Sequence, residues 1–182
     1  DLTGRDYRSP AVFQFDQHGL DRALAVVPTD LAIVLANTSE LGGMAIHHAT
    51  VTTGTDEWED VGIHEFAHLL GMLGDEYDID ECIRSDSMGL PPNITDTPRD
   101  PPWMHWVDDD TPLPTPTHAG HDEHVGAFEH AYNCSDLYRP AEDCMMRSNG
   151  QDFCAVCSEQ LVLQVTRYAD IALPTLTEDA DG

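Results

Sequence analysis

His64, Glu65 and His68 have the residue types and the spacing that metal-dependent hydrolysis requires. Residues four apart in a helix point to the same side, so two imidazoles one turn apart can bind one metal ion. Zinc binds neutral imidazole nitrogen, takes three protein ligands in catalytic sites, and leaves its fourth position to a water whose pKa falls to about 7. A carboxylate beside that position can remove the proton and later transfer it to a departing amine. The pattern therefore predicts zinc at His64 and His68, with Glu65 as general base.

The neighbouring residues predict that this motif lies on a helix. Apolar side chains recur around it at helix-like spacing, namely Trp58, Val61, Ile63, Phe66, Leu69, Leu70 and Leu73. The acids Glu57, Glu59 and Asp60 precede the motif, where the dipole of a helix favours negative charge. A chain with ten histidines contains the five-residue pattern by chance in about a few per cent of cases. The helical context makes chance a poor explanation here.

The third ligand is expected just after the helix. Gly71 stands where a chain that leaves a helix through a left-handed turn prefers glycine. This resembles the metzincin extension, in which a ligand follows that glycine by three residues. Gly74 occupies the ligand position here and has no side chain, so we expect Asp75 to bind the metal. The alternative is that Asp75 caps a turn and that Glu76, Asp78 or a distant histidine completes the site.

Several segments together resemble the IgA peptidase family of zinc metallopeptidases, over roughly residues 30 to 165. The segments are Asn37–Gly43, His64–Gly71, Gly74–Tyr77, Cys144–Ser148 and Phe153–Cys157. The resemblance implies that His64, His68 and Asp75 are the zinc ligands and Glu65 the general base. It also implies that Met146 is the methionine of a metzincin-type Met-turn beneath the metal, with Met145 as the competing candidate.

The same resemblance implies an α+β, zincin or metzincin-like fold and a single catalytic domain over residues 1–182. We expect an upper part, about residues 1–71, with a twisted sheet and the active-site helix. A lower, loop-rich part, about residues 72–182, is expected to end in a helix. In such folds an edge strand, here Gly42–His48, lines the substrate groove by pairing with an extended peptide; the alternative is an ordinary edge strand with no ligand.

Local patterns predict the remaining elements. They indicate a short helix at Asp16–Val27, a buried strand at Asp30–Asn37, an extended segment at Met44–Thr53 and an amphipathic helix at Val156–Ala169. Residues 78–125 are rich in Pro, Asp and Thr and are expected to form a long irregular loop. Trp103 and Trp106 within this loop either line the cleft or anchor the loop to the core.

The charge of the chain excludes some partners. Eight basic residues, all arginine, face 34 acidic residues, for a net charge of −26. Such a surface repels nucleic acid and anionic membranes. The acidity suits a high-salt environment or calcium binding. Asp78, Asp80 and Glu81, or Asp108–Asp110, could hold calcium, but neither group fits an EF-hand loop, so a solvated acidic surface is the default. The cluster His118, His121, His124 and His130 is expected to be a solvated loop rather than a ligand set.

Cysteines and hydropathy indicate an exported protein that does not insert in a membrane. The longest apolar run, Leu31–Ala36, is too short to span a bilayer. The first residue is Asp1, so a signal or pro-segment is expected to have been removed. In an extracellular or cell-surface protein, two disulfides among Cys82, Cys134, Cys144, Cys154 and Cys157 would leave one thiol. The rival interpretation is a second zinc at Cys154 and Cys157, although a structural zinc needs four ligands.

Together these features predict a monomeric zinc-dependent endopeptidase that hydrolyses protein or peptide substrates. Two alternatives belong to other classes. One is a catalytically silent module that binds protein or glycan on the same fold. The other is a zinc hydrolase that acts on bonds other than peptide bonds. A silent module is expected to have lost the general base or a ligand, and this chain keeps His64, Glu65 and His68.

Overall fold

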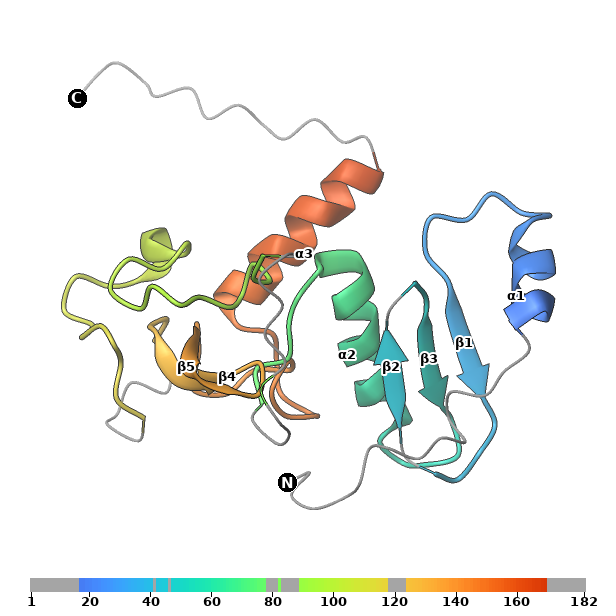
Figure 1. Cartoon of the computed structure of the whole chain (residues 1–182), viewed down its shortest axis with the longest axis horizontal. Helices are drawn as coiled ribbons and strands as arrows, with labels where there is room; N and C mark the ends of the chain where they lie inside the picture. The colour runs from blue at the N-terminus through green and yellow to red at the C-terminus, as the bar shows by residue number, and fades with distance from the viewer. Residues whose placement is uncertain are drawn as a thin grey trace.

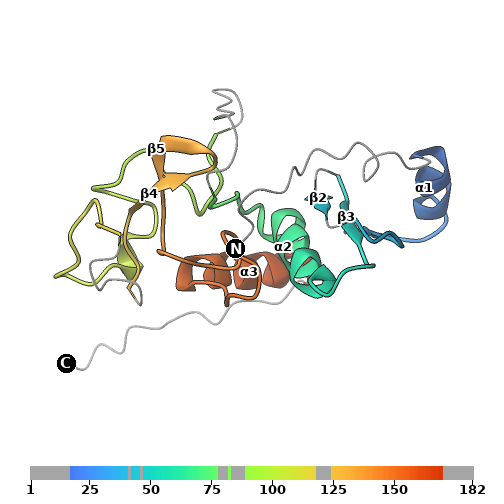
Figure 2. The ribbon, with the colours of Figure 1, turned by 90° about the horizontal axis from the view of Figure 1, so that it is seen from below.

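The computed structural model describes residues 17–40, 42–45, 47–77, 82, 89–117 and 124–169. The fold is α+β. A small sheet with helix α1 (Gln17–Leu24) lies at one end of the molecule, helices α2 (Trp58–Gly71) and α3 (Ala155–Tyr168) lie in the middle, and a β-hairpin lies at the other end (Figure 1). The view from below also places α2 and α3 next to each other (Figure 2).

The sheet contains three strands in the order β1-β3-β2. The elements of this region are α1 (Gln17–Leu24), β1 (Ile33–Ala36), β2 (Gly43–Ala45) and β3 (Ala49–Thr52). Strand β1 is parallel to β3, and β2 is antiparallel to it with Gly43 opposite Val51. The extended segment predicted at Met44–Thr53 thus forms two strands.

Burial separates the central strand from its neighbours. Every residue of β3 is buried, whereas Ile33 and Leu35 of β1 are 47% and 61% exposed. A strand does form within the predicted range Asp30–Asn37, at Ile33–Ala36, but the expectation that it is buried is wrong. The reason is that β1 lies at the sheet edge, while α2 packs against β2 and β3.

Helix α2 (Trp58–Gly71) carries the predicted motif and has Glu59 and Asp60 in its first turn. Its C-terminus differs from expectation, because the left-handed residue is Met72 (φ 55°) and not Gly71. Gly71 is the last helical residue, and a Cβ there would lie 2.9 Å from Cγ of Leu73 and 3.0 Å from Cδ2 of Leu161 in α3. The glycine therefore serves close packing against Leu73 and α3 rather than the turn.

The lower region contains η1 (Met104–Trp106), the hairpin β4 (Phe128–Ala131) and β5 (Cys134–Arg139), and α3 (Ala155–Tyr168). The final helix and the irregular loop were predicted, but the hairpin was not. Its strands are joined by Tyr132 and Asn133, both at positive φ, between the paired residues Ala131 and Cys134. Such two-residue turns usually carry Asn-Gly, and the absence of that signal hides this hairpin in the sequence.

Trp103 anchors the long loop to the core. Its side chain is 1% exposed, and Nε1 donates a hydrogen bond to the Gly126 carbonyl at 2.7 Å. Trp106 is partly exposed and donates to Glu159 of α3. Trp103 thus takes the anchoring role, one of the two roles that the sequence leaves open.

The cysteines form one disulfide, Cys82–Cys134, and three free thiols at Cys144, Cys154 and Cys157. The expectation of two disulfides and one thiol is therefore wrong. Within the described part of the chain, no helix is both long and apolar enough to cross a bilayer.

Candidate metal centre and active site

Three side chains predicted as ligands converge on one point. The Nε2 atoms of His64 and His68 lie 3.1 Å apart, and Asp75 Oδ1 lies 3.1 Å and 3.0 Å from them. Ligand atoms about 2.0–2.1 Å from a tetrahedral zinc are separated by about 3.3–3.4 Å. The triangle is therefore close to the size of one face of a zinc coordination tetrahedron.

The two imidazoles come from successive turns of α2. Their four-residue spacing places both on one side of the helix, with the ring centroids 4.7 Å apart. Both residues are largely buried, because the lower region covers this face of the helix. Tyr77 stacks on the His64 ring with an interplanar angle of 15°.

Backbone carbonyls fix which ring nitrogen faces the centre. His64 Nδ1 lies 3.0 Å from the Met145 carbonyl, and His68 Nδ1 lies 2.7 Å from the Leu73 carbonyl. A carbonyl oxygen only accepts hydrogen bonds, so Nδ1 of each ring carries the hydrogen. Each Nε2 lone pair then points at the other and at Asp75. Such an arrangement of lone pairs is stable only with a proton or a metal cation between them.

The segment after α2 is held from both sides at Asp75. Asn93 is fully buried, accepts from the Gly74 amide at 2.7 Å, and donates to Glu76 Oε1 at 2.9 Å. The Glu76 amide donates to the Met146 carbonyl at 2.8 Å. Because Gly74 and Glu76 are both anchored, Asp75 between them directs its carboxylate at the histidines. Asp75 can therefore take the ligand position that Gly74, without a side chain, cannot fill.

Asp75 and His68 each stabilise the charged form of the other. Burial penalises the charged form of His68, but its hydrogen bond to Asp75 and the charge of Asp75 raise the pKa of His68 to about 9. Burial likewise opposes ionisation of Asp75, yet its hydrogen bonds to the two histidines hold the pKa of Asp75 well below its usual range. Without a metal, the site therefore keeps an anionic carboxylate beside a protonated ring.

Glu65 lies next to the two histidines with its carboxylate against strand β2. A Cβ on Gly43 would lie 2.5 Å from Glu65 Oε1 and 2.6 Å from its Cγ, so only glycine leaves room for this side chain. Burial raises the pKa of Glu65, and the charges of His68 and His64 partly offset that rise. Such a carboxylate is suited to accepting and returning a proton.

A sequence model of the family described as IgA Peptidase M64 matches residues 11–123 and 117–165, which is most of the chain. The chain belongs to the IgA peptidase M64 family. No curated protein matches it. The M64 family consists of metallopeptidases, so this M64 peptidase is a hydrolase whose substrates are proteins.

The structure of this M64 peptidase also places the other predicted groups. Met146 is fully buried in a core cluster with Ala67 and Leu73, whereas Met145 offers its carbonyl to His64. His124 of the second histidine group contacts Asp108 at 3.1 Å. Among the described residues, Asp108–Asp110 do not belong to any group of converging ligand atoms.

Other expectations fall on residues that the structure does not describe. His118, His121, Asp78, Asp80 and Glu81 lie outside the described residues of the M64 peptidase.

The sequence does not reveal the groups that hold the three predicted ligands in place. They are the carbonyls of Leu73 and Met145 and the amide of Asn93. Every residue has a backbone carbonyl, whatever its side chain. No sequence signal could therefore have identified the carbonyls of Leu73 and Met145. Asn93 follows Pro91-Pro92 in an irregular loop, where an asparagine is usually only a turn residue.

Proposed function

We propose that this chain is a zinc-dependent endopeptidase in which His64, His68 and Asp75 bind the metal and Glu65 is the general base. The observation that carries the proposal is the convergence of three ligand atoms within 3.1 Å of one another beside that glutamate. Two imidazoles and one carboxylate form a ligand set typical of catalytic zinc. The hydrogen bonds from each Nδ1 to a carbonyl are the outer contacts that orient such ligands.

Each group of the site would have a separate role in the reaction. When bound, zinc would act as a Lewis acid that lowers the pKa of the attacking water and polarises the scissile carbonyl. Glu65 would accept a proton from that water and deliver it to the amine nitrogen as the peptide bond breaks. Met145 and Leu73 hold both rings in the tautomer that directs Nε2 to the centre.

The position of Glu65 beside β2 supports a binding mode for the substrate. In the described part of the sheet, β2 pairs only with β3, so its other edge has no strand partner. We propose that an extended peptide adds to this edge and so passes the Glu65 carboxylate. The groove would include the predicted strand Gly42–His48, of which Ile46 is outside the described residues.

We extend the proposal to the fold type, the oligomeric state and the location of the protein. A sheet packed on α2, a left-handed exit from that helix, and a Met146 buried in a cluster with Ala67 and Leu73 support a zincin or metzincin-like domain with a Met-turn. The three proposed ligands and the proposed base lie within residues 64–75, which supports one catalytic unit, and we propose that it acts as a monomer. The Cys82–Cys134 disulfide supports an extracellular or cell-surface location.

Replacing the general base tests the proposal. Glu65→Gln keeps the shape of the side chain and removes its ability to accept a proton. Cleavage of a mixed protein substrate should fall by about 10²–10⁴-fold while zinc remains bound. Glu59→Gln, an exposed acid on the same helix, is the matched control and should cleave like the unmodified protein.

Three outcomes are distinguishable. Unchanged cleavage by Glu65→Gln would contradict the role of Glu65. Zinc binding without any cleavage of peptides by the unmodified chain would favour the silent binding module. A zinc-dependent activity confined to non-peptide substrates would favour the other hydrolase class.

A further inference from the structure

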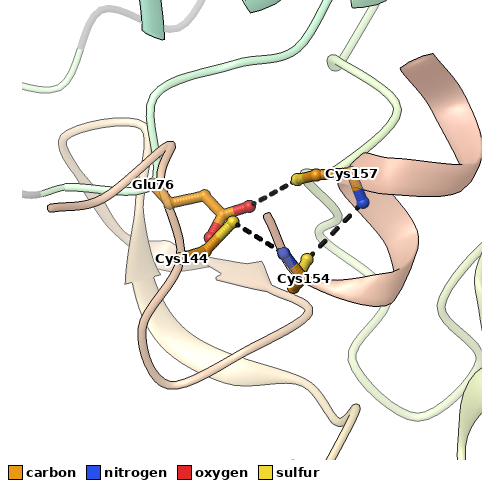
Figure 3. A group of neighbouring side chains, drawn as sticks. All are labelled: Glu76, Cys144, Cys154 and Cys157. Carbon is orange, nitrogen blue, oxygen red and sulfur yellow. Dashed lines mark hydrogen bonds between the residues drawn. The ribbon is translucent and has the colours of Figure 1, made fainter. Parts of the chain in front are cut away.

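Glu76, Cys144, Cys154 and Cys157 form a second group of metal-binding side chains (Figure 3). One ligand atom from each lies within 4.8 Å of the others. Three of the four residues are 0% exposed, and Cys154 is half-buried. The group draws on three separate segments, which are the chain after α2, the turn after β5 and the start of α3.

The hydrogen bonds of the group suit thiolates. The Cys154 amide lies 3.3 Å from Cys144 Sγ and donates to it, and the Cys157 amide donates to Cys154 Sγ at 3.5 Å. The Cys-x-x-Cys pair caps α3, where the helix dipole favours negative charge. Amide donors and a helix N-terminus stabilise the thiolate form, which is the form that binds metals.

One carboxylate oxygen in the group has no partner. Glu76 Oε1 accepts from Asn93 at 2.9 Å and lies 3.3 Å from Cys157 Sγ. Glu76 Oε2 is buried and accepts no hydrogen bond from the described residues. A buried carboxylate oxygen without a donor is costly, and a cation satisfies it.

We propose that these four residues bind a second metal ion and that this ion is a structural Zn²⁺. Three sulfurs and one carboxylate complete a tetrahedron and leave no position for water, as structural zinc requires. In such a site sulfurs are about 3.8 Å apart, and sulfur and oxygen about 3.5 Å apart, for Zn–S near 2.3 Å. The group needs to contract by only about 1 Å to reach that geometry.

A disulfide between two of the three cysteines is the alternative to zinc, and it accounts for fewer of the four groups. Three thiols are an odd number, so any pairing leaves one sulfur and Glu76 Oε2 without a partner. Zinc uses all four groups. It also reduces the negative charge of the group, because three thiolates and a carboxylate carry −4 and Zn²⁺ brings the sum to −2. Arg147 donates to the Glu76 carbonyl at 2.8 Å, and the buried Arg139 interacts electrostatically with Glu76.

The second ion would connect the segments that shape the first site. Glu76 directly follows Asp75, and Cys144 directly precedes Met145, whose carbonyl holds His64. Zinc at the second site would therefore fix two backbone segments relative to each other. This role stands whether or not the first site is catalytic.

Metal analysis of variants tests the second site. The full chain with His64→Ala and His68→Ala should retain one zinc per chain after dialysis against buffer. Adding Cys154→Ser and Cys157→Ser should remove that zinc. Adding Cys82→Ser and Cys134→Ser instead, which removes two cysteines outside the group, should leave it bound. Absence of zinc from the double-histidine variant would overturn the proposal.

Two measurements need no variant. The unmodified protein loaded with Co²⁺ should show sulfur-to-cobalt charge-transfer absorption, which the nitrogen and oxygen ligands of the first site cannot give. Denatured, unreduced protein treated with a chelator should have three reactive thiols. A cobalt spectrum without that absorption, or a single reactive thiol, would overturn the proposal.

Discussion

Gly43 of β2 and Glu65 of α2 are in direct contact, and the contact depends on the absence of a side chain at position 43. A Cβ there would meet Glu65 Oε1 at 2.5 Å and Val61 Cγ1 at 2.7 Å. The edge strand and the proposed general base therefore occupy one tightly packed unit.

Gly43→Ala should displace the Glu65 carboxylate. We expect a loss of at least about tenfold in kcat/KM, with zinc retained, because a proton carrier that moves by about 1 Å works poorly. The overpacking should also cost about 1–3 kcal/mol of unfolding free energy. Enzyme assays, zinc analysis and chemical denaturation measure the three quantities.

Gly62→Ala is the matched control for that change. Gly62 lies on α2, the helix that carries Glu65. A Cβ on Gly62 would lie 3.9 Å from its nearest neighbour, Val51 Cγ1, which is an ordinary contact. Activity should be unchanged, and stability should stay equal or rise by up to about 1 kcal/mol. Equal behaviour of the two alanine variants would refute the packing argument.

Asp75→Ala should weaken zinc binding at the first site by more than about 100-fold, because it removes a direct ligand. Competition with a chromophoric chelator measures the affinity. Asp56→Ala, an exposed acid before α2, should bind zinc normally. Undiminished affinity in Asp75→Ala would transfer the ligand role to another residue.

Asn93→Ala should destabilise the fold and loosen the first metal site together. It removes hydrogen bonds of 2.7 Å and 2.9 Å to Gly74 and of 2.9 Å to Glu76, all buried. Leaving these groups unpaired should cost about 2–4 kcal/mol, and zinc affinity should fall because Asp75 lies between the two anchored residues. Asn37→Ala, at an exposed position, should change stability by no more than about 0.5 kcal/mol. Full stability in the Asn93 variant would show that the bridge is dispensable.

Replacing both Cys82 and Cys134 with serine should lower the unfolding free energy by about 2–4 kcal/mol. The disulfide closes a loop across a sequence separation of 52, which restricts the unfolded chain. Denaturant titration with and without a reducing agent measures the effect. Reduction should destabilise the unmodified protein by a similar amount and leave the double variant unchanged. A reductant effect of equal size in both proteins would place the sensitive bond elsewhere.

Local patterns were sufficient for the parts of this protein that depend on neighbours in the chain. The positions of His64, Glu65 and His68 follow from helical spacing, and α2 and α3 follow from apolar periodicity. The presence of a carboxylate ligand candidate soon after the helix also followed from the sequence, since only a few side chains there can bind zinc.

Elements without a periodic or turn signal depended on the tertiary structure. The exposure of β1 depends on which strand lies at the sheet edge, and the hairpin turn at Tyr132 and Asn133 lacks the usual residues. The left-handed conformation falls on Met72, whereas Gly71 is packed closely against Leu73 and against Leu161 of α3.

The grouping of Glu76 with Cys144, Cys154 and Cys157 was also beyond the sequence. Cys154-x-x-Cys157 alone supplies two ligands, and the other two come from positions up to 81 residues away in the chain. Long-range packing decides which side chains meet, because no local rule links the chain after one helix to the start of another. For this protein the sequence determined which side chains of the first site could bind a metal, and the tertiary structure decided what surrounds and supports them.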